Sequence, residues 1–229
     1  MKRTVIGDVL WVSTISIITA LLALPITHQI FIQWTSSHPY WMGFFKFALL
    51  ATMGEILALR IAHRGWKRSV GMVWKIIVWG ILGVLITFMF SFYSAGVSII
   101  MASAATLLNN SFLSMLVQAF LTSLLMNLTF GIVFMAGHRL SDTYIEMRFK
   151  QKKPSLKELV HAVDWEGFLA FVVFKSIPLF WIPAHTLTFL LPASYRVVTA
   201  AYLSIILGLI LVYANRTNKA RAVNENSAD

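Results

Sequence analysis

The sequence contains no cysteine, and its charged residues are scarce. The missing thiols exclude disulfide bridges, thiolate catalysis and cysteine-ligated metal sites. Charged residues make up 12% of the 229 positions and hydrophobic residues 58%, whereas a soluble domain has about 25% charged and about 45–50% apolar residues. The composition therefore predicts an integral membrane protein.

The formal net charge is +10, and most of the 19 basic residues fall into four clusters separated by long apolar runs. The clusters are Lys2 with Arg3, 60–68, 139–157 and 216–221. Positive charge marks the cytoplasmic side of a membrane protein, so the chain is expected to cross the bilayer twice between successive clusters. This pattern predicts an all-α polytopic bundle of about six transmembrane helices with both termini in the cytoplasm. Anionic lipid headgroups are the expected partners of the clusters, which lack the features of a nucleic-acid surface.

Six apolar runs approach or exceed the roughly 20 residues that cross a hydrocarbon core of about 30 Å. The expected spans are 9–32, 41–61, 73–93, 112–136, 168–191 and 197–214. The uncharged segment 94–111 extends a neighbouring helix, lies in the interface or re-enters the membrane. A full span there would place the basic residues near 150–153 outside, against the charge pattern. We expect one membrane domain over 1–217 and a disordered polar tail over 218–229.

One segment, 141–166, is polar enough to lie outside the bilayer. Within it, Ser155 and Glu158 have the spacing of a capping box at a helix start. Apolar residues then recur at helical spacing, at Leu156, Leu159, Val160 and Val163. This stripe favours a short amphipathic helix on the cytoplasmic face of the membrane. A lead-in to the fifth span is the alternative.

Three charged residues inside the expected spans are functional candidates, because charge in the membrane is costly. They are Lys46 and Glu55 in the second span and Lys175 in the fifth. Glu55 and Lys175 both lie roughly 8–11 Å from the inner ends of their spans at 1.5 Å per residue, so we expect them to form an ion pair. Such a pair either fixes the helix register or lines a water-filled path. Lys46 lies nearer the outer end, where its ammonium can snorkel to the interface.

The fifth span contains Pro178 and Pro183, each of which lacks a backbone donor and crowds the preceding turn. The freed carbonyls need partners in protein or water, so this span is expected to be broken twice, as a structural kink or as part of a permeation path. His185 lies in the outer half of the same span, and Asn127 lies in the fourth span. Polar side chains at such positions usually hold helices together.

No sequence motif indicates an enzyme. The chain lacks a P-loop, a nucleophile elbow, a zinc-protease helix and an EF-hand loop, and Glu55 is the only carboxylate well inside an expected span. The histidines do not match any metal-ligand spacing. We therefore expect no catalytic residue, no metal and no cofactor.

Two stretches resemble the family of small organellar membrane proteins typified by Mpv-seventeen and the peroxisomal membrane protein of the 22-kDa class. His38-Pro39-Tyr40 followed by Gly54-Glu55-Ile56-Leu57-Ala58 is similar to the family's opening motif, with Glu55 in place of its Asp. Trp181-Ile182-Pro183, Phe189 and Pro192-Ala193-Ser194-Tyr195-Arg196-Val197 resemble its second block. The motif-like residues are His38, Pro39, Gly54, Glu55, Trp181, Pro192, Tyr195 and Arg196. The resemblance implies a multi-pass membrane protein with channel or small-solute transport activity.

Two functions are compatible with these features. The intramembrane charges, the prolines of the fifth span and the resemblance favour a passive pore or low-selectivity transporter for a small solute or ion. The basic cytoplasmic loops instead favour a non-transporting scaffold that binds anionic lipid or a protein partner. The charge pattern suits a bacterial cytoplasmic membrane, with the mitochondrial inner membrane as the alternative. The first span is expected to be retained rather than cleaved, and an oligomer is compatible with the sequence.

Overall fold

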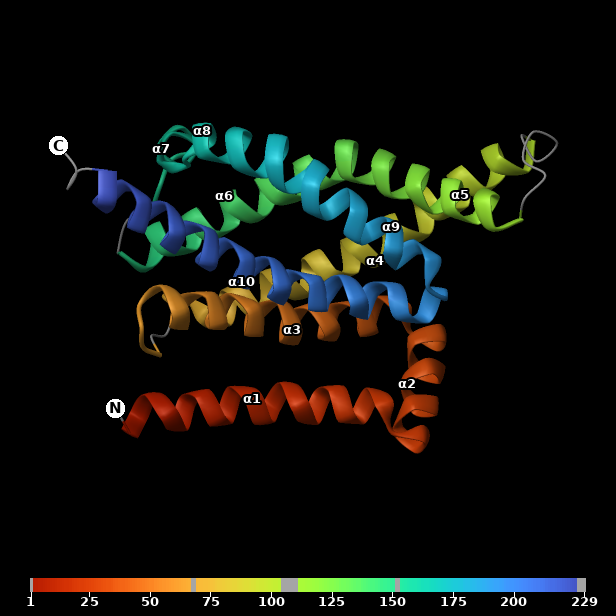
Figure 1. The fold of residues 1–229 in the computed structure, drawn as a ribbon, viewed down its shortest axis with the longest axis horizontal. Coiled ribbons are helices and arrows are strands. Elements are labelled where there is room, and N and C mark those ends of the chain that lie inside the picture. The colour runs from red at the N-terminus through yellow and green to blue at the C-terminus, as the bar shows by residue number, and fades with distance from the viewer. Residues whose placement is uncertain (1, 67–68, 104–110, 151–152, 226–229) are drawn as a thin grey trace.

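The computed structural model describes residues 2–66, 69–103, 111–150 and 153–225, and all regular elements within these ranges are helices (Figure 1). In chain order they are α1 (Lys2–Ala23), α2 (Pro25–Ser37), α3 (Pro39–Ala62), α4 (Met72–Ser103), α5 (Ser111–Met126), η2 (Asn127–Gly131), α6 (Ile132–Phe149), α7 (Leu156–Ala162), α8 (Trp165–Gly167), η3 (Phe168–Trp181), α9 (Ile182–Leu190) and α10 (Ala193–Glu225). Six stretches of these ranges are long and apolar enough to cross a membrane: Thr4–Ala23, Pro39–Ala62, Met72–Ser103, Ser111–Phe149, Trp165–Leu190 and Ala193–Ile210. The expected all-α multi-pass bundle is therefore confirmed.

α1 begins and α10 ends at the same end of the bundle, as an even number of crossings requires (Figure 1). The basic residues Arg60, Arg148, Lys153 and Lys157 belong to helix ends and connections at this end. We call it the inner end, and we call the opposite end, where α2 lies, the outer end. Placing the inner end in the cytoplasm stays a prediction from the distribution of positive charge.

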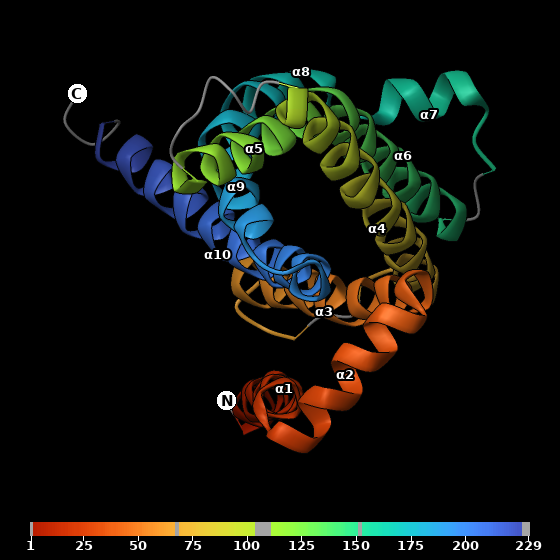
Figure 2. The same cartoon turned by 90° about the vertical axis from the view of Figure 1, so that its right-hand side faces the viewer.

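The first expected span, 9–32, is wrong at its outer boundary. α1 ends at Ala23, and α2 begins at Pro25 and turns across the outer end of the bundle (Figures 1 and 2). Leu24 between them has an extended backbone, with φ −69° and ψ 132°. The ring of Pro25 disfavours helical geometry in the preceding residue and provides a preorganised first turn for a new helix. A proline inside an apolar run thus ends one helix and starts the next.

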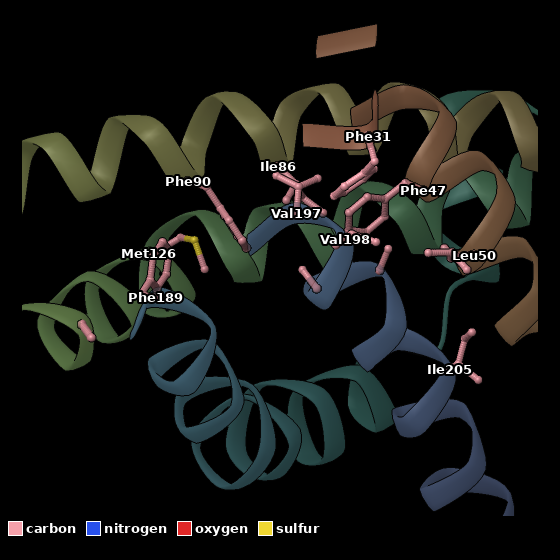
Figure 3. Packing of buried hydrophobic residues seen from close by; sticks show 14 residues of the cluster. Phe31, Phe47, Leu50, Ile86, Phe90, Met126, Phe189, Val197, Val198 and Ile205 are labelled. Atoms are coloured by element: carbon pink, nitrogen blue, oxygen red, sulfur yellow. The ribbon is translucent and has the colours of Figure 1, made fainter. Parts of the chain in front are cut away.

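α3 lies at the centre of the packing because it contacts both α4 and α10. A Cβ added at Gly83 of α4 would collide with the backbone of Gly43 in α3, and one added at Gly54 would come within 3.1 Å of the Ile205 backbone in α10. These small residues let the helix backbones approach closely, as in other membrane bundles. The buried core then joins α2, α3, α4, α5, α9 and α10 (Figure 3).

The described part of the segment 94–111, residues 94–103, extends a neighbouring helix, which is one of the three arrangements expected for it. α4 continues to Ser103, and α5 begins at Ser111. Residues 104–110 lie outside the described ranges.

The fifth span is not broken at its two prolines. It runs continuously from Trp165 to Leu190, and π-helical turns occupy η3 around Pro178. The N–H of Ile182 bonds to the Ile177 carbonyl five residues back. Pro183, which has no N–H to continue this pattern, falls in the first turn of α9. The wider turn therefore accommodates the prolines without interrupting the helix, and η2 forms a second π-helical segment in the fourth span.

The capping box before α7 is confirmed. Ser155 Oγ accepts from the Glu158 N–H at 3.3 Å, and the Ser155 N–H donates to Glu158 Oε2 at 2.9 Å. α7 is a separate helix with no buried residue, so the segment is more than a lead-in to the fifth span.

At the C-terminus, a disordered tail was expected over 218–229, but α10 continues to Glu225. Alanine, lysine and arginine in this stretch favour helix. Residues 226–229 lie outside the described ranges.

Candidate functional site: a cavity with polar ends inside the bundle

A cavity of ≈ 210 Å³ lies inside the bundle, between α3, α4, α5, η2, α6, η3, α9 and α10. Figure 2 views these helices from the outer end. Most of the wall is apolar and includes Phe47, Ile86, Phe90, Phe130 and Phe134. The side chains with polar atoms on the wall are those of Glu55, Trp79, Asn127, His138, Trp181, His185 and Ser204. A space of this size accommodates several water molecules or one small solute. We call it the central cavity.

Beside the inner end of the central cavity, where Glu55 and His138 line the wall, a buried lysine is surrounded by carboxylates. Lys75 Nζ lies 2.8 Å from Glu55 Oε1, 3.5 Å from Glu146 Oε1 and 3.7 Å from Asp142 Oδ2. The lysine side chain is only 5% exposed. When all four groups are ionised, one positive charge faces three negative charges, so this inner cluster is negative overall.

Two aromatic rings complete the inner cluster. Trp79 Nε1 donates to Glu55 Oε2 at 3.3 Å, and its ring packs on His138 with 4.1 Å between ring centroids. His138 Nδ1 lies 3.9 Å from Asp142 Oδ2. The other ring nitrogen, His138 Nε2, is buried without a hydrogen-bond partner among the described residues. The cluster therefore holds a buried polar atom with capacity for one more contact.

A second cluster of hydrogen-bonded polar side chains lies in the middle of the bundle. Asn127, the first residue of η2, donates its amide to the Ser123 carbonyl at 2.8 Å and contacts His185 Nδ1 of α9 at 3.1 Å. Ser123 Oγ donates to the Ile182 carbonyl at 2.7 Å. His185 in turn stacks on Trp181, with 5.0 Å between ring centroids. The fourth and fifth spans are thus joined where both leave regular α-helical geometry.

A further cavity of ≈ 210 Å³ opens between α2, α3, α4 and the start of α10. Its lining residues are Thr35, Ser36, Pro39, Lys46, Thr87, Phe90, Ser91, Ala193, Ser194, Arg196 and Val197. We call it the outer pocket. Phe90 belongs to the walls of both the outer pocket and the central cavity.

Lys46 does not snorkel to the interface. The residue is 8% exposed, and its Nζ donates to Thr35 Oγ1 at 2.9 Å and lies 4.5 Å from the centre of the Phe31 ring. α2 folds over the outer end of α3 and covers this lysine, which a straight first span would have left uncovered.

The expected ion pair between Glu55 and Lys175 is wrong. Glu55 bonds to Lys75 of α4, whereas Lys175 is exposed on the outside of the bundle. Depth alone placed Glu55 and Lys175 at the same level. α4 packs directly against α3, however, and this packing places Lys75 next to the Glu55 carboxylate. Lys175 can instead extend its stem along the surface of the span.

Glu55 is also not an isolated carboxylate. α6 continues as a helix to Phe149, well beyond the expected end of the fourth span at 136. His138, Asp142 and Glu146 recur every fourth residue on this helix and therefore share one face. Sequence analysis missed this cluster, although the spacing, together with Lys75 and Trp79 at the same spacing on α4, is a signal that could have revealed it.

Among the motif-like residues, His38, Pro39, Pro192 and Tyr195 lie at or just before helix starts, whereas Gly54 lies within α3 and Trp181 is the last residue of η3. His38 separates α2 from α3, Pro39 is the first residue of α3, and Pro192 directly precedes α10. Tyr195 Oη lies 2.8 Å from His28 Nε2, so the start of α10 is held against α2. Their contacts in the structure fix the geometry of the outer end.

Within the described residues, no group of three or more histidine, aspartate or glutamate side chains is arranged to hold a metal ion. Comparison with known proteins finds no matching family model, no matching curated protein and no matching solved structure.

Proposed function

We propose that this membrane protein provides a passive, low-selectivity pathway for small solutes or ions across the bilayer. The observation that supports the proposal is the alignment of the outer pocket and the central cavity along α3. Pro39 lines the outer pocket and Ala58 lines the central cavity. At 1.5 Å per residue these two positions are about 28 Å apart, which is close to the hydrocarbon thickness of about 30 Å.

In this conformation, Phe90 separates the outer pocket from the central cavity. Phe90 is 4% exposed, and its ring packs against those of Phe189 (Figure 3) and His185, with ring centroids 4.9 and 5.4 Å away. An apolar constriction of this kind excludes water and ions. We infer that Phe90 is the gate and that the conformation is closed.

The fifth span is the wall element that we expect to move. η3 and η2 both flank the central cavity, and π-helical turns occur frequently at functional sites. The resemblance to a family with channel or small-solute transport activity supports the same function. Lys175 is exposed and does not line the proposed pathway, contrary to the role considered for it from the sequence. The polar groups of the outer pocket and the central cavity take that role in the proposal.

The test is flux through the purified protein in liposomes, with glycerol and potassium chloride as probes. We expect Phe90→Ala to raise the flux of both probes because it removes the ring between the outer pocket and the central cavity, and Phe90→Leu to have a smaller effect. The matched control is Phe88→Ala, since Phe88 lies on the same helix but is 47% exposed on the outer surface of the bundle.

Flux that is absent in the wild-type protein and in both Phe90 variants would reject the pathway. If the protein then still bound vesicles containing phosphatidylglycerol in a salt-sensitive manner, the scaffold function would take its place. Equal flux in the Phe90 and Phe88 variants would reject Phe90 as the gate.

A further inference from the structure

The outer pocket contains a buried positive charge without a protein counter-charge. Among the described residues, no carboxylate lies within salt-bridge distance of Lys46, and its ammonium donates to Thr35 Oγ1 alone. An ammonium has three N–H donors. Lys75, which is also buried, faces three carboxylates. A buried charge normally requires a compensating partner. Lys75 has carboxylates as partners, whereas Lys46 has none among the described residues.

A second cation lines the same pocket. Arg196 donates from Nε to the Leu191 carbonyl at 2.9 Å and from Nη1 to Ser94 Oγ at 3.1 Å, and no carboxylate pairs with it within the described residues. These bonds hold the guanidinium in place and use part of its five donors. The remaining N–H donors of the Arg196 guanidinium are available for an oxyanion, which a guanidinium typically binds through two parallel hydrogen bonds.

The backbone adds positive potential at the same place. Ala193 and Ser194, the first two residues of α10, line the pocket. The N-terminus of a helix carries a partial positive charge and free N–H groups, which favour anions. The pocket thus combines a buried ammonium, a fixed guanidinium and a helix start.

We propose that the outer pocket is a binding site for a small oxyanion of the phosphate class, held between Lys46 and Arg196. The site is independent of the pathway proposed above, because an anion can occupy it whether or not solutes pass Phe90. The pocket volume of ≈ 210 Å³ suits one such group. The phosphate belongs either to a free anion or to the headgroup of a lipid in the outer leaflet.

The experiment measures binding at equilibrium, without flux. In nanodiscs of phosphatidylcholine, we expect inorganic phosphate to raise the unfolding temperature of the wild-type protein in a saturable manner. Lys46→Gln and Arg196→Gln should each weaken the apparent Kd at least tenfold. Lys175→Gln is the matched control, because it removes the same charge from an exposed position in a span, and it should bind phosphate as the wild type does.

A second arm distinguishes the two sources of the phosphate group. If a lipid headgroup is the occupant, nanodiscs containing phosphatidylglycerol should stabilise the wild-type protein, and inorganic phosphate should add little. Lys46→Gln should then lose the difference between the two lipid compositions. If the free anion is the occupant, phosphate should stabilise equally in both compositions.

Lys46→Met guards against a failure of folding. Replacing an uncompensated buried charge by an apolar side chain of similar length is often neutral or stabilising, so without anion this variant should unfold at or above the wild-type temperature. It should nevertheless gain nothing from phosphate or phosphatidylglycerol. Wild-type protein that neither ligand stabilises would overturn the proposal, as would equal stabilisation of the wild type and Lys46→Met.

Discussion

Replacing Lys75 by methionine is expected to destabilise the bundle more than any other single change at a lysine. The substitution keeps a long, flexible apolar side chain but removes the ammonium that faces Glu55, Asp142 and Glu146. The three carboxylates would then share a largely buried space without this positive charge. Because the like charges repel and remain poorly hydrated, the free energy of unfolding should fall.

The magnitude follows from how deeply each partner is buried. Removing one partner of a buried ion pair typically costs about 3–5 kcal/mol. Glu55 is 18% exposed and keeps contacts with Trp79 and Ser69, while Glu146 is 52% exposed and can turn to solvent. Both facts reduce the penalty, so we expect a loss near the lower limit, about 3 kcal/mol.

The assay is reversible unfolding in mixed micelles, followed for a double-mutant cycle. Lys75→Met and Glu55→Gln should each destabilise, and the double variant should recover part of the loss, with a coupling free energy in the range of about 0.5–3 kcal/mol found for contacting residues. Lys175→Met is the control and should change stability by less than about 0.5 kcal/mol, since Lys175 is exposed. Equal effects of the two lysine variants, or strictly additive losses in the cycle, would refute the reasoning.

Two further predictions concern topology and the middle of the bundle. Because the native chain lacks cysteine, single cysteines at Ser36 and Lys153 report topology without background: an impermeant thiol reagent should label the first in intact cells and the second only after permeabilisation, and the reverse pattern would invert the proposed orientation. Asn127→Leu should lower the free energy of unfolding by about 1–3 kcal/mol, because it leaves the ring of His185 without its partner in a buried site; chemical denaturation measures the loss, and an unchanged midpoint would show that the contact contributes nothing.

Hydropathy and charge predicted the depth of each span but not the direction in which its side chains point. Glu55 lies in the inner half of the second span, as its distance from Arg60 indicated. Its partner depends on which helix packs against α3, and the close approach of Gly43 and Gly83 lets α4 pack there. The sequence contains Lys75 at a suitable depth, but depth alone does not favour it over Lys175.

Some local backbone features, such as helix caps and turns, could be predicted from the sequence. The capping box of α7 depends on side chains three residues apart and was visible in the sequence. The turn from α1 to α2 depends on Pro25, whose effect is local but was obscured by the apolar residues on both sides. The π-helical turns of η2 and η3 have no comparable signal, because the same residues form α-helix equally well and contacts between the spans decide the geometry.

The unequal pairing of the buried Lys46 and Lys75 also affects how the bundle interacts with the membrane potential. In the proposed orientation, the uncompensated positive charge of Lys46 lies on the outer side and the excess negative charge around Lys75 lies on the inner side. A potential that is negative inside attracts the former inward and repels the latter outward. Each elementary charge carried across the whole membrane contributes about 2.3 kcal/mol per 100 mV. In this orientation, a resting potential therefore pulls both charged sites toward the middle of the membrane, and depolarisation reduces that force.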